Sequence, residues 1–184
     1  MIYTLANQFS EPIRSYQWNM VEAIANRFPS LTLTLRQNIP AHFTLKYHFE
    51  TDNISEVEFL LTAFAKDYRG AAITVGQFEH FNYQTIFSRI ELSESAQFLY
   101  DELIGLLRGI SWMQWQQFDA PNLLFHMTVA EQCGELGQSI LEFARSCEQT
   151  FQTTLDNITI YQQTSMAEDG LTFWDVHKRF DLTQ

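Results

Sequence analysis

The sequence predicts an α+β domain, and three observations support this. Segments with the two-residue alternation of strands take turns along the chain with segments of helical spacing. No linker or low-complexity stretch separates them, and 184 residues fall within the usual size of about 100–200 residues for one domain. A short pattern also occurs twice, which suggests two lobes of related design. We therefore expect a single domain over residues 1–184.

Four segments have apolar residues at helical spacing. Ser55, with Glu58 three residues later, and Ser93 are typical N-cap residues because their hydroxyls accept hydrogen bonds from exposed backbone N–H groups. Pro29 ends the first segment and Gly70 follows the second, as is common beyond a helix. The sequence therefore predicts helices over residues 11–28, 55–68, 93–107 and 135–149.

Strands are predicted from alternating or short apolar runs bounded by turn residues. The last two strands are joined by the turn-prone residues 167–170. The predicted strands cover residues 2–6, 31–35, 42–49, 71–78, 85–92, 123–130, 155–163 and 171–182.

Composition and charge exclude several classes of protein. With 46% hydrophobic and 18% charged residues, the chain is not a disordered tail, which would lack the apolar area to fold. The 22 Asp and Glu outnumber the 11 Lys and Arg, so the net charge is −11. Binders of long duplex nucleic acid depend on many basic contacts to phosphates. We expect no such partner, and any anionic ligand must be small and bound locally.

Location and assembly are expected from simple features. No run of about 18 apolar residues occurs, which argues against a membrane helix. The first residues lack the basic and apolar regions of a secretory signal, and the two cysteines form no C-x-x-C pair. We expect a cytoplasmic monomer with no membrane partner.

The repeated pattern is His, apolar, Thr, apolar, starting at positions 42 and 126, which are 84 residues apart. On a strand, side chains two residues apart share a face. His42 therefore shares a face with Thr44, and His126 with Thr128. If the two strands lie side by side, two imidazoles and two hydroxyls converge on one small space.

Such a group of side chains suits the cleavage of a phosphodiester. One neutral histidine can take a proton from the attacking water or hydroxyl, and one protonated histidine can give a proton to the leaving oxygen. Histidine suits both roles because its ordinary pKa is about 6.5. The threonine hydroxyls can donate hydrogen bonds to the non-bridging oxygens. This scheme requires no metal ion and no cofactor.

Three further residues are candidates for substrate binding. Lys46 continues the face of His42 and Thr44, so it can contact the phosphate or its approach path, or simply face water. Arg89 is a charged residue inside an apolar run, where it can be an anion clamp or a charge at a sheet edge. Tyr83 can stack on a base or pack in the core.

The two motifs resemble those of the two-histidine (2H) phosphoesterase superfamily, which includes the LigT-like 2′-5′ RNA ligases and cyclic phosphodiesterases. Residues 42–47 resemble its first motif, and residues 126–130 its second. The resemblance implies a bilobal fold, with two antiparallel sheets facing a central cleft and helices outside. It also implies that His42 and His126 are the acid and base, in either order, and that Thr44 and Thr128 hold the phosphate. Family members often have Pro immediately before the second histidine, where this chain has Phe125.

Two functions follow as hypotheses. The first is a metal-independent phosphoesterase that hydrolyses a cyclic phosphodiester, such as the 2′,3′-cyclic phosphate of an RNA end or nucleotide. By microscopic reversibility, its site could also join ends through a 2′-5′ bond. The second is a catalytically silent cleft that binds a phosphorylated nucleotide or RNA end as a sensor. The acidic surface and Phe125 motivate the second hypothesis.

Overall fold

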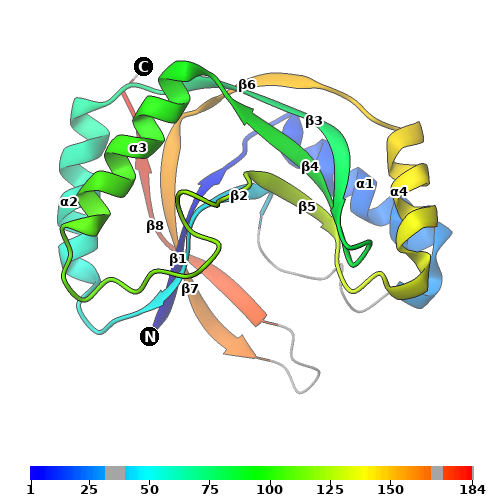
Figure 1. The fold of residues 1–184 in the computed structure, drawn as a ribbon, viewed down its shortest axis with the longest axis horizontal. Helices are drawn as coiled ribbons and strands as arrows, with labels where there is room; N and C mark the ends of the chain where they lie inside the picture. Colours follow the sequence, from blue (N-terminus) through cyan, green and yellow to red (C-terminus); the bar gives the residue numbers. More distant parts are fainter. Residues whose placement is uncertain (32–39, 167–171, 184) are drawn as a thin grey trace.

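The computed structural model describes residues 1–31, 40–166 and 172–183. Strands and helices alternate along most of the chain, as predicted (Figure 1). The strands are β1 (Ile2–Gln8), β2 (His42–Glu50), β3 (Ala71–Phe81), β4 (Thr85–Leu92), β5 (His126–Ala130), β6 (Phe151–Leu155), β7 (Asn157–Met166) and β8 (Thr172–Asp181). The α-helices are α1 (Ile13–Arg27), α2 (Ile54–Asp67), α3 (Glu94–Arg108) and α4 (Gly137–Ser146).

The strands form two antiparallel sheets of four strands each. The first sheet has the order β2-β1-β7-β8, and the second has the order β5-β4-β3-β6. Strands β2 and β5, which carry the two motifs, are therefore edge strands of different sheets. They also lie side by side at the centre of the molecule (Figure 1).

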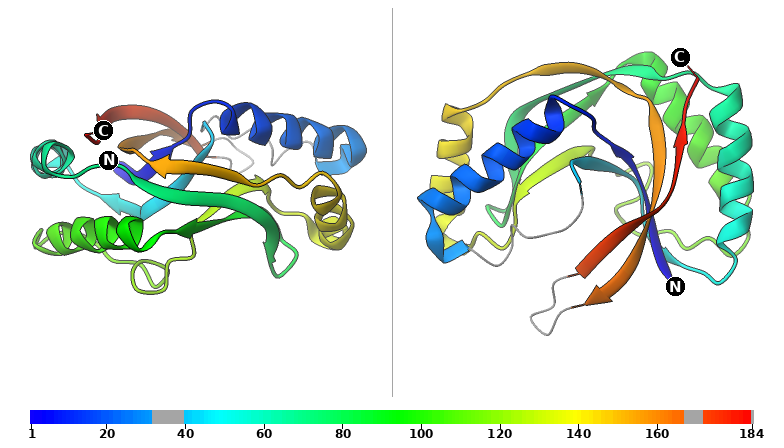
Figure 2. Two further views of the ribbon diagram at one scale, coloured as in Figure 1. Left: turned by 90° about the horizontal axis from the view of Figure 1, so that it is seen from above. Right: turned by 180° about the vertical axis from the view of Figure 1, so that it is seen from behind.

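The two sheets have corresponding topologies. In each sheet the motif strand lies at one edge and pairs with the strand that precedes it in the chain, with one helix between them: β1-α1-β2 in the first sheet and β4-α3-β5 in the second. Helices α2 and α3 lie at one end of the molecule, and α1 and α4 at the other (Figure 2). The expected α+β fold with two related lobes is confirmed.

The hydrophobic core has a large and a small part. The large part joins the buried faces of both sheets to α2 and α3 and includes Leu5, Phe43, Leu61, Phe64, Ile73, Val75, Leu103, Met127 and Ile160. The small part packs α1 and α4 against the second sheet and includes Met20, Ile24, Phe78, Ile86, Val129, Ile140 and Leu141. Burial of this apolar area holds the two motif strands in place from behind.

Several predicted boundaries need correction. The predicted strand over residues 31–35 is wrong at Leu31, which belongs to the short 3-10 helix Pro29–Leu31, and its remaining residues lie outside the described ranges. Strand β6 was not predicted, because the segment 151–155 has only five residues and most of them are polar. The predicted helix over residues 135–149 begins as a 3-10 turn and ends at Ser146. The predicted turn over residues 167–170 lies outside the described residues.

The helix caps agree in part with the prediction. The Ser93 hydroxyl accepts a hydrogen bond from the backbone N–H of Ala96, so it caps α3 as expected. Helix α2 starts one residue earlier than expected, with Asn53 rather than Ser55 at the N-cap position. Within the described ranges, no helix is both long enough and apolar enough to cross a membrane.

Candidate active site

The two motif strands show the same alternation of burial. Phe43 and Leu45 on β2, and Met127 and Val129 on β5, are buried in the core. The residues that alternate with them, His42, Thr44, His126 and Thr128, are partly exposed on the opposite face. We call these four residues the motif site. Local alternation therefore places both histidines and both threonines as the sequence predicts.

Each histidine ring is oriented by its own backbone. The Nδ1 atom of His42 lies 2.8 Å from the carbonyl oxygen of Pro40, and that of His126 lies 2.7 Å from the carbonyl oxygen of Leu124. A carbonyl oxygen only accepts hydrogen bonds, so Nδ1 must carry the proton in both rings. In the neutral rings, Nε2 is then the unprotonated nitrogen that can take up a proton.

Burial sets the charge of both rings. It lowers the pKa of His42 to about 4, against the opposing effect of the Pro40 carbonyl, and the nearby His126 lowers it further. Burial likewise lowers the pKa of His126, again against the effect of its carbonyl partner. Both rings are therefore neutral near pH 7 in the free protein. A bound phosphate anion would favour the protonated form of either ring, because opposite charges attract.

The two threonine hydroxyls complete the motif site. Thr44 lies opposite Ala6 of β1, and Thr128 lies opposite Phe87 of β4. Within the described ranges, neither hydroxyl has a hydrogen-bond partner in the protein. Both are therefore available as donors to a ligand oxygen.

Two aromatic rings contact His126, and the sequence predicted neither of them. Phe81 meets the His126 ring edge-on, with centroids 5.2 Å apart, and Phe87 lies at 5.0 Å. Phe87 is fully buried, whereas Phe81 is 40% exposed and can also contact a ligand. The candidate Tyr83 lies in the turn after Phe81, where it stacks on His80 at 3.9 Å. It therefore lies at the tip of the hairpin, beyond Phe81.

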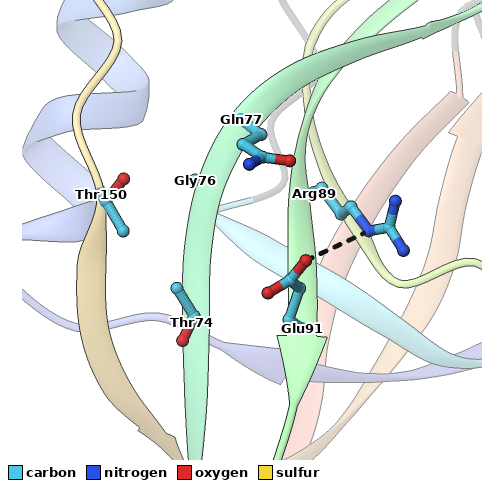
Figure 3. Close-up of a pocket in the computed structure, with 6 residues that line it drawn as sticks. All are labelled: Thr74, Gly76, Gln77, Arg89, Glu91 and Thr150. Atoms are coloured by element: carbon cyan, nitrogen blue, oxygen red, sulfur yellow. Dashed lines mark ion pairs between the residues drawn. The ribbon is translucent and has the colours of Figure 1, made fainter.

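Arg89 lies on the same sheet face as the second motif. It is directly opposite His126 in the pairing of β4 with β5, and such residues share a face. Its guanidinium is 41% exposed and donates a hydrogen bond of 3.0 Å to Glu79, with Glu91 3.8 Å away. A small pocket of about 70 Å³ continues from Arg89 over Gly76 to Thr150 (Figure 3). The cation is thus next to the motif site, and the Glu91 carboxylate lines the pocket beside it.

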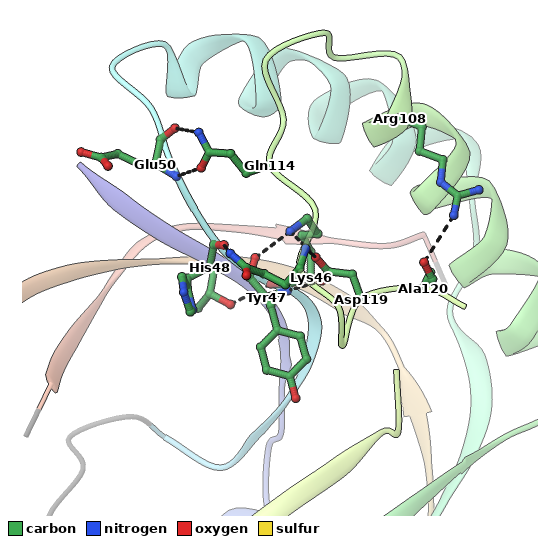
Figure 4. Close-up of polar contacts among 10 residues, drawn as sticks. Lys46, Tyr47, His48, Glu50, Arg108, Gln114, Asp119 and Ala120 are labelled. Carbon is green, nitrogen blue, oxygen red and sulfur yellow. Dashed lines mark hydrogen bonds and ion pairs between the residues drawn. The ribbon is translucent and has the colours of Figure 1, made fainter. Parts of the chain in front are cut away.

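Lys46 does not belong to the motif site, and its predicted contact with substrate is wrong. The pairing of β1 with β2 shifts register around Leu5, which breaks the alternation of β2 after Thr44. Lys46 is therefore fully buried, and its Nζ lies 2.8 Å from the Asp119 carboxylate (Figure 4). The Trp115 ring lies 5.0 Å from the same ammonium.

Asp119 was not found from the sequence, although it connects the surroundings of the two motifs. Its carboxylate accepts hydrogen bonds from Lys46 and from the backbone N–H groups of Tyr47 and Gln116 (Figure 4). The segment between α3 and β5, which leads to His126, is thereby attached to the strand that carries His42. Lys46 thus contacts the segment that leads to the second motif from the strand that carries the first.

Phe125, the departure from the family pattern, has a structural role. Its side chain is buried, with its ring edge-on to Phe43 at 5.9 Å and to Tyr100 at 4.8 Å. The residues next to the two histidines, Phe43 and Phe125, thus pack against each other. Phe125 secures the approach of β5 rather than obstructing it.

The two imidazoles, with their oriented protons, can transfer protons at a bound phosphate. The two threonine hydroxyls and the neighbouring guanidinium can donate hydrogen bonds to its oxygens. Among the residues that the structure describes, no cluster of three or more His, Cys, Asp or Glu side chains could hold a metal ion. The fold and these residues define a bilobal protein with one histidine-threonine motif at the edge of each sheet.

Comparisons agree with this class. The family model of the 2′-5′ RNA ligase superfamily matches residues 9–165, so the chain belongs to this superfamily. Curated protein sequences give no match. TT0787 of Thermus thermophilus superposes with a TM-score of 0.71 at 16% identity, over 99% of this chain and 98% of that one. A structure titled as a phosphoesterase gives a TM-score of 0.66 at 17% identity, over 100% and 99% of the two chains.

A third similar structure is E. coli LigT complexed with 3′-AMP, with a TM-score of 0.62 at 16% identity over 99% of this chain and 98% of that one. Other structures of LigT contain NADP⁺, phosphate or ATP. At these identities the similarity establishes the fold alone, and it confirms the LigT-like architecture expected from the motifs.

Proposed function

We propose that this protein is a metal-independent phosphoesterase that opens a cyclic phosphodiester, such as the 2′,3′-cyclic phosphate of an RNA end or nucleotide. The observation that carries the proposal is the matched orientation of the two histidines. Both hold a proton on Nδ1 through a backbone carbonyl, so both use Nε2 for exchange with a ligand. Membership in the 2′-5′ RNA ligase superfamily supports this type of chemistry.

The reaction needs one proton taken and one proton given. One neutral histidine accepts a proton from water as its oxygen forms a bond to phosphorus. The P–O bond to one ring oxygen breaks, and the protonated second histidine gives its proton to that oxygen. The products are a phosphate monoester and a free ribose hydroxyl. The two rings end with exchanged protonation states and return to the start through proton exchange with solvent.

The remaining motif-site groups bind the substrate. Thr44 and Thr128 donate hydrogen bonds to the non-bridging oxygens, which strengthen as negative charge builds up on them. Arg89, opposite His126, supplies positive charge beside the phosphate. Tyr83 would contact only a ligand that extends past Phe81 toward the tip of the hairpin.

The substrate is small. A net charge of −11 repels a long polyanion, so we propose a nucleotide or the terminus of an RNA rather than duplex nucleic acid. The nucleotides in the LigT structures support a ligand of this class. The reverse reaction, with a ribose hydroxyl in place of water, would form a 2′-5′ bond.

The test is hydrolysis of the four 2′,3′-cyclic nucleotides in the presence of EDTA, with the native protein, His42→Ala and His126→Ala. We expect turnover by the native protein alone. His177→Gln is the matched control, because His177 lies on β8 and contacts Glu58 at 2.8 Å through Nε2, which the glutamine amide can replace. It should retain full activity.

The same experiment separates the enzyme from the sensor. The sensor hypothesis would be supported if calorimetry shows that the protein binds 3′-AMP but the protein turns over no cyclic nucleotide and no oligonucleotide with a 2′,3′-cyclic phosphate end. The enzyme hypothesis would then be rejected. Turnover that is retained in both alanine variants would exclude the two-histidine mechanism.

A further inference from the structure

Tyr161 of β7 lies beside the first histidine. Its neighbours in the chain, Ile158 and Ile160, belong to the large core, which places Tyr161 on the opposite face, the one that carries His42. The rings of Tyr161 and His42 are 5.8 Å apart between centroids and inclined by 50°. Ala6 of β1 lies between them in the sheet, opposite both Thr44 and Thr159, and its small side chain leaves room for this approach.

The hydroxyl of Tyr161 is buried and has no hydrogen-bond partner. The side chain is 0% exposed, and no acceptor or donor within the described ranges reaches its Oη. Buried polar groups are nearly always paired, because an unpaired one loses its hydrogen bonds to water without replacement. The Tyr161 hydroxyl lies on the ring beside His42, a candidate catalytic group. A bound ligand that accepts its hydrogen bond would explain why the hydroxyl has no partner within the protein.

The surroundings favour an anionic oxygen as that partner. Burial raises the pKa of Tyr161, so the phenol stays protonated and can donate. Arg179 lies opposite Thr159 on β8, on the same face, and its positive charge acts on the Tyr161 phenol. The side of the motif site near His42 thus carries one donor and one cation, and this cation is paired with Asp181 at 2.7 Å, as Arg89 near His126 is paired with Glu79.

We propose that the Tyr161 hydroxyl is a substrate-binding group, which donates a hydrogen bond to a phosphate oxygen of the ligand held beside His42. This inference rests on the proposed function and adds a group that neither motif contains. With Arg89 included, the substrate phosphate is then held by groups from four strands, β2, β4, β5 and β7.

The chain offers a matched pair of variants for the test. Tyr100 of α3 is also buried, at 4% exposure, and its hydroxyl is also unpaired, but it lies in the large core against Phe125. Tyr161→Phe and Tyr100→Phe therefore remove the same group from the same kind of environment. Only the first change should affect the ligand.

The measurements are kcat/KM for a 2′,3′-cyclic nucleotide, the Kd of 3′-AMP by calorimetry, and the melting temperature. Tyr161→Phe should lower kcat/KM and raise the Kd by about 10- to 100-fold, which is typical for a hydrogen bond to a charged group. Its melting temperature should be unchanged or higher, since no bond within the protein is lost. Tyr100→Phe should match the native protein in both ligand assays.

Three outcomes would overturn the inference. If Tyr161→Phe hydrolyses and binds like the native protein, the hydroxyl does not touch the ligand, although the proposed function stands. A clear fall in melting temperature would show that the hydroxyl is structural. If the native protein neither hydrolyses cyclic nucleotides nor binds 3′-AMP, the inference and the proposed function both fail. If it binds without turnover, the 3′-AMP titration still decides the role of Tyr161.

Discussion

His42 and His126 are held by the same backbone arrangement, one on each sheet. In both, Nδ1 donates to the carbonyl oxygen two residues earlier in the chain, over 2.8 Å for His42 and 2.7 Å for His126. The arrangement fixes the tautomer and the ring orientation without the carboxylate partner that often serves this purpose. It also follows from the local chain alone, which explains how both lobes have it.

This arrangement predicts a difference between two substitutions of His42. An asparagine amide nitrogen can replace Nδ1 and keep the bond to Pro40, whereas alanine cannot. His42→Asn should therefore be more stable than His42→Ala, by about 1 kcal/mol. Both should lose turnover by at least about 100-fold because neither has Nε2. Urea unfolding and cyclic-nucleotide hydrolysis check this, and equal stability would argue against the backbone bond.

The unequal pKa values suggest the roles of the two rings. Burial lowers the pKa of His42 to about 4, so His42 is the more firmly neutral ring and the better candidate for the base. A substrate with a p-nitrophenolate leaving group needs little help from an acid. On bis(p-nitrophenyl) phosphate, His126→Ala should thus retain far more of the native rate than His42→Ala. The opposite ranking would exchange the two roles.

The pKa of His42 also predicts how stability depends on pH. The unfolded chain takes up a proton near 6.5, whereas the folded protein takes it up only near 4. Stability is therefore highest above pH 6.5 and falls between pH 6.5 and 4, by about 3 kcal/mol from this residue. Burial lowers the pKa of His126 as well, which acts in the same direction. Urea unfolding at pH 7.5 and 4.5 checks this.

The matched control for this pH effect is His42→Asn, which cannot titrate. Its loss of stability between pH 7.5 and 4.5 should be smaller than that of the native protein by about 2.5 kcal/mol, the part of the His42 effect that falls in this window. An identical loss in both proteins would show that His42 is not responsible.

The Lys46–Asp119 pair predicts a large effect on stability from a residue outside the motif site. Asp119→Ala leaves the buried ammonium of Lys46 without its partner, which typically costs about 3–5 kcal/mol. The double change Lys46→Met with Asp119→Ala should recover part of this loss, because no unpaired charge remains. Urea unfolding of the single and double variants measures the loss of stability and its partial recovery. A loss of less than about 1 kcal/mol in Asp119→Ala would show that the ion pair is not buried as described.

Arg89 predicts a change in substrate affinity rather than in folding. Arg89→Met should raise the KM for a cyclic nucleotide by up to about tenfold, since the guanidinium is partly exposed and screened. Its melting temperature should change little. Arg108→Met is the control, because Arg108 lies on α3 and packs against Trp115 at 5.5 Å. Equal KM values for the two variants would show that Arg89 does not contribute to substrate binding.

Much of the motif site could be predicted because it depends on local periodicity. The alternation of His42 with Phe43 and of His126 with Met127 places each histidine on the face opposite its apolar neighbour. The helices are also encoded in large part locally, by the spacing of their apolar residues and, for α3, by the capping residue Ser93. These features need no information about distant pairing.

The sequence by itself thus determined that two histidine-threonine strands exist and which side chains they expose. Only the tertiary structure decided the rest. A register shift opposite Leu5 turned Lys46 into the core toward Asp119, and sheet pairing brought Tyr161 to His42 and Arg89 opposite His126. Each of these depends on how strands far apart in the chain align, and a shift of one residue reverses a face. Periodicity along one strand carries no record of that alignment.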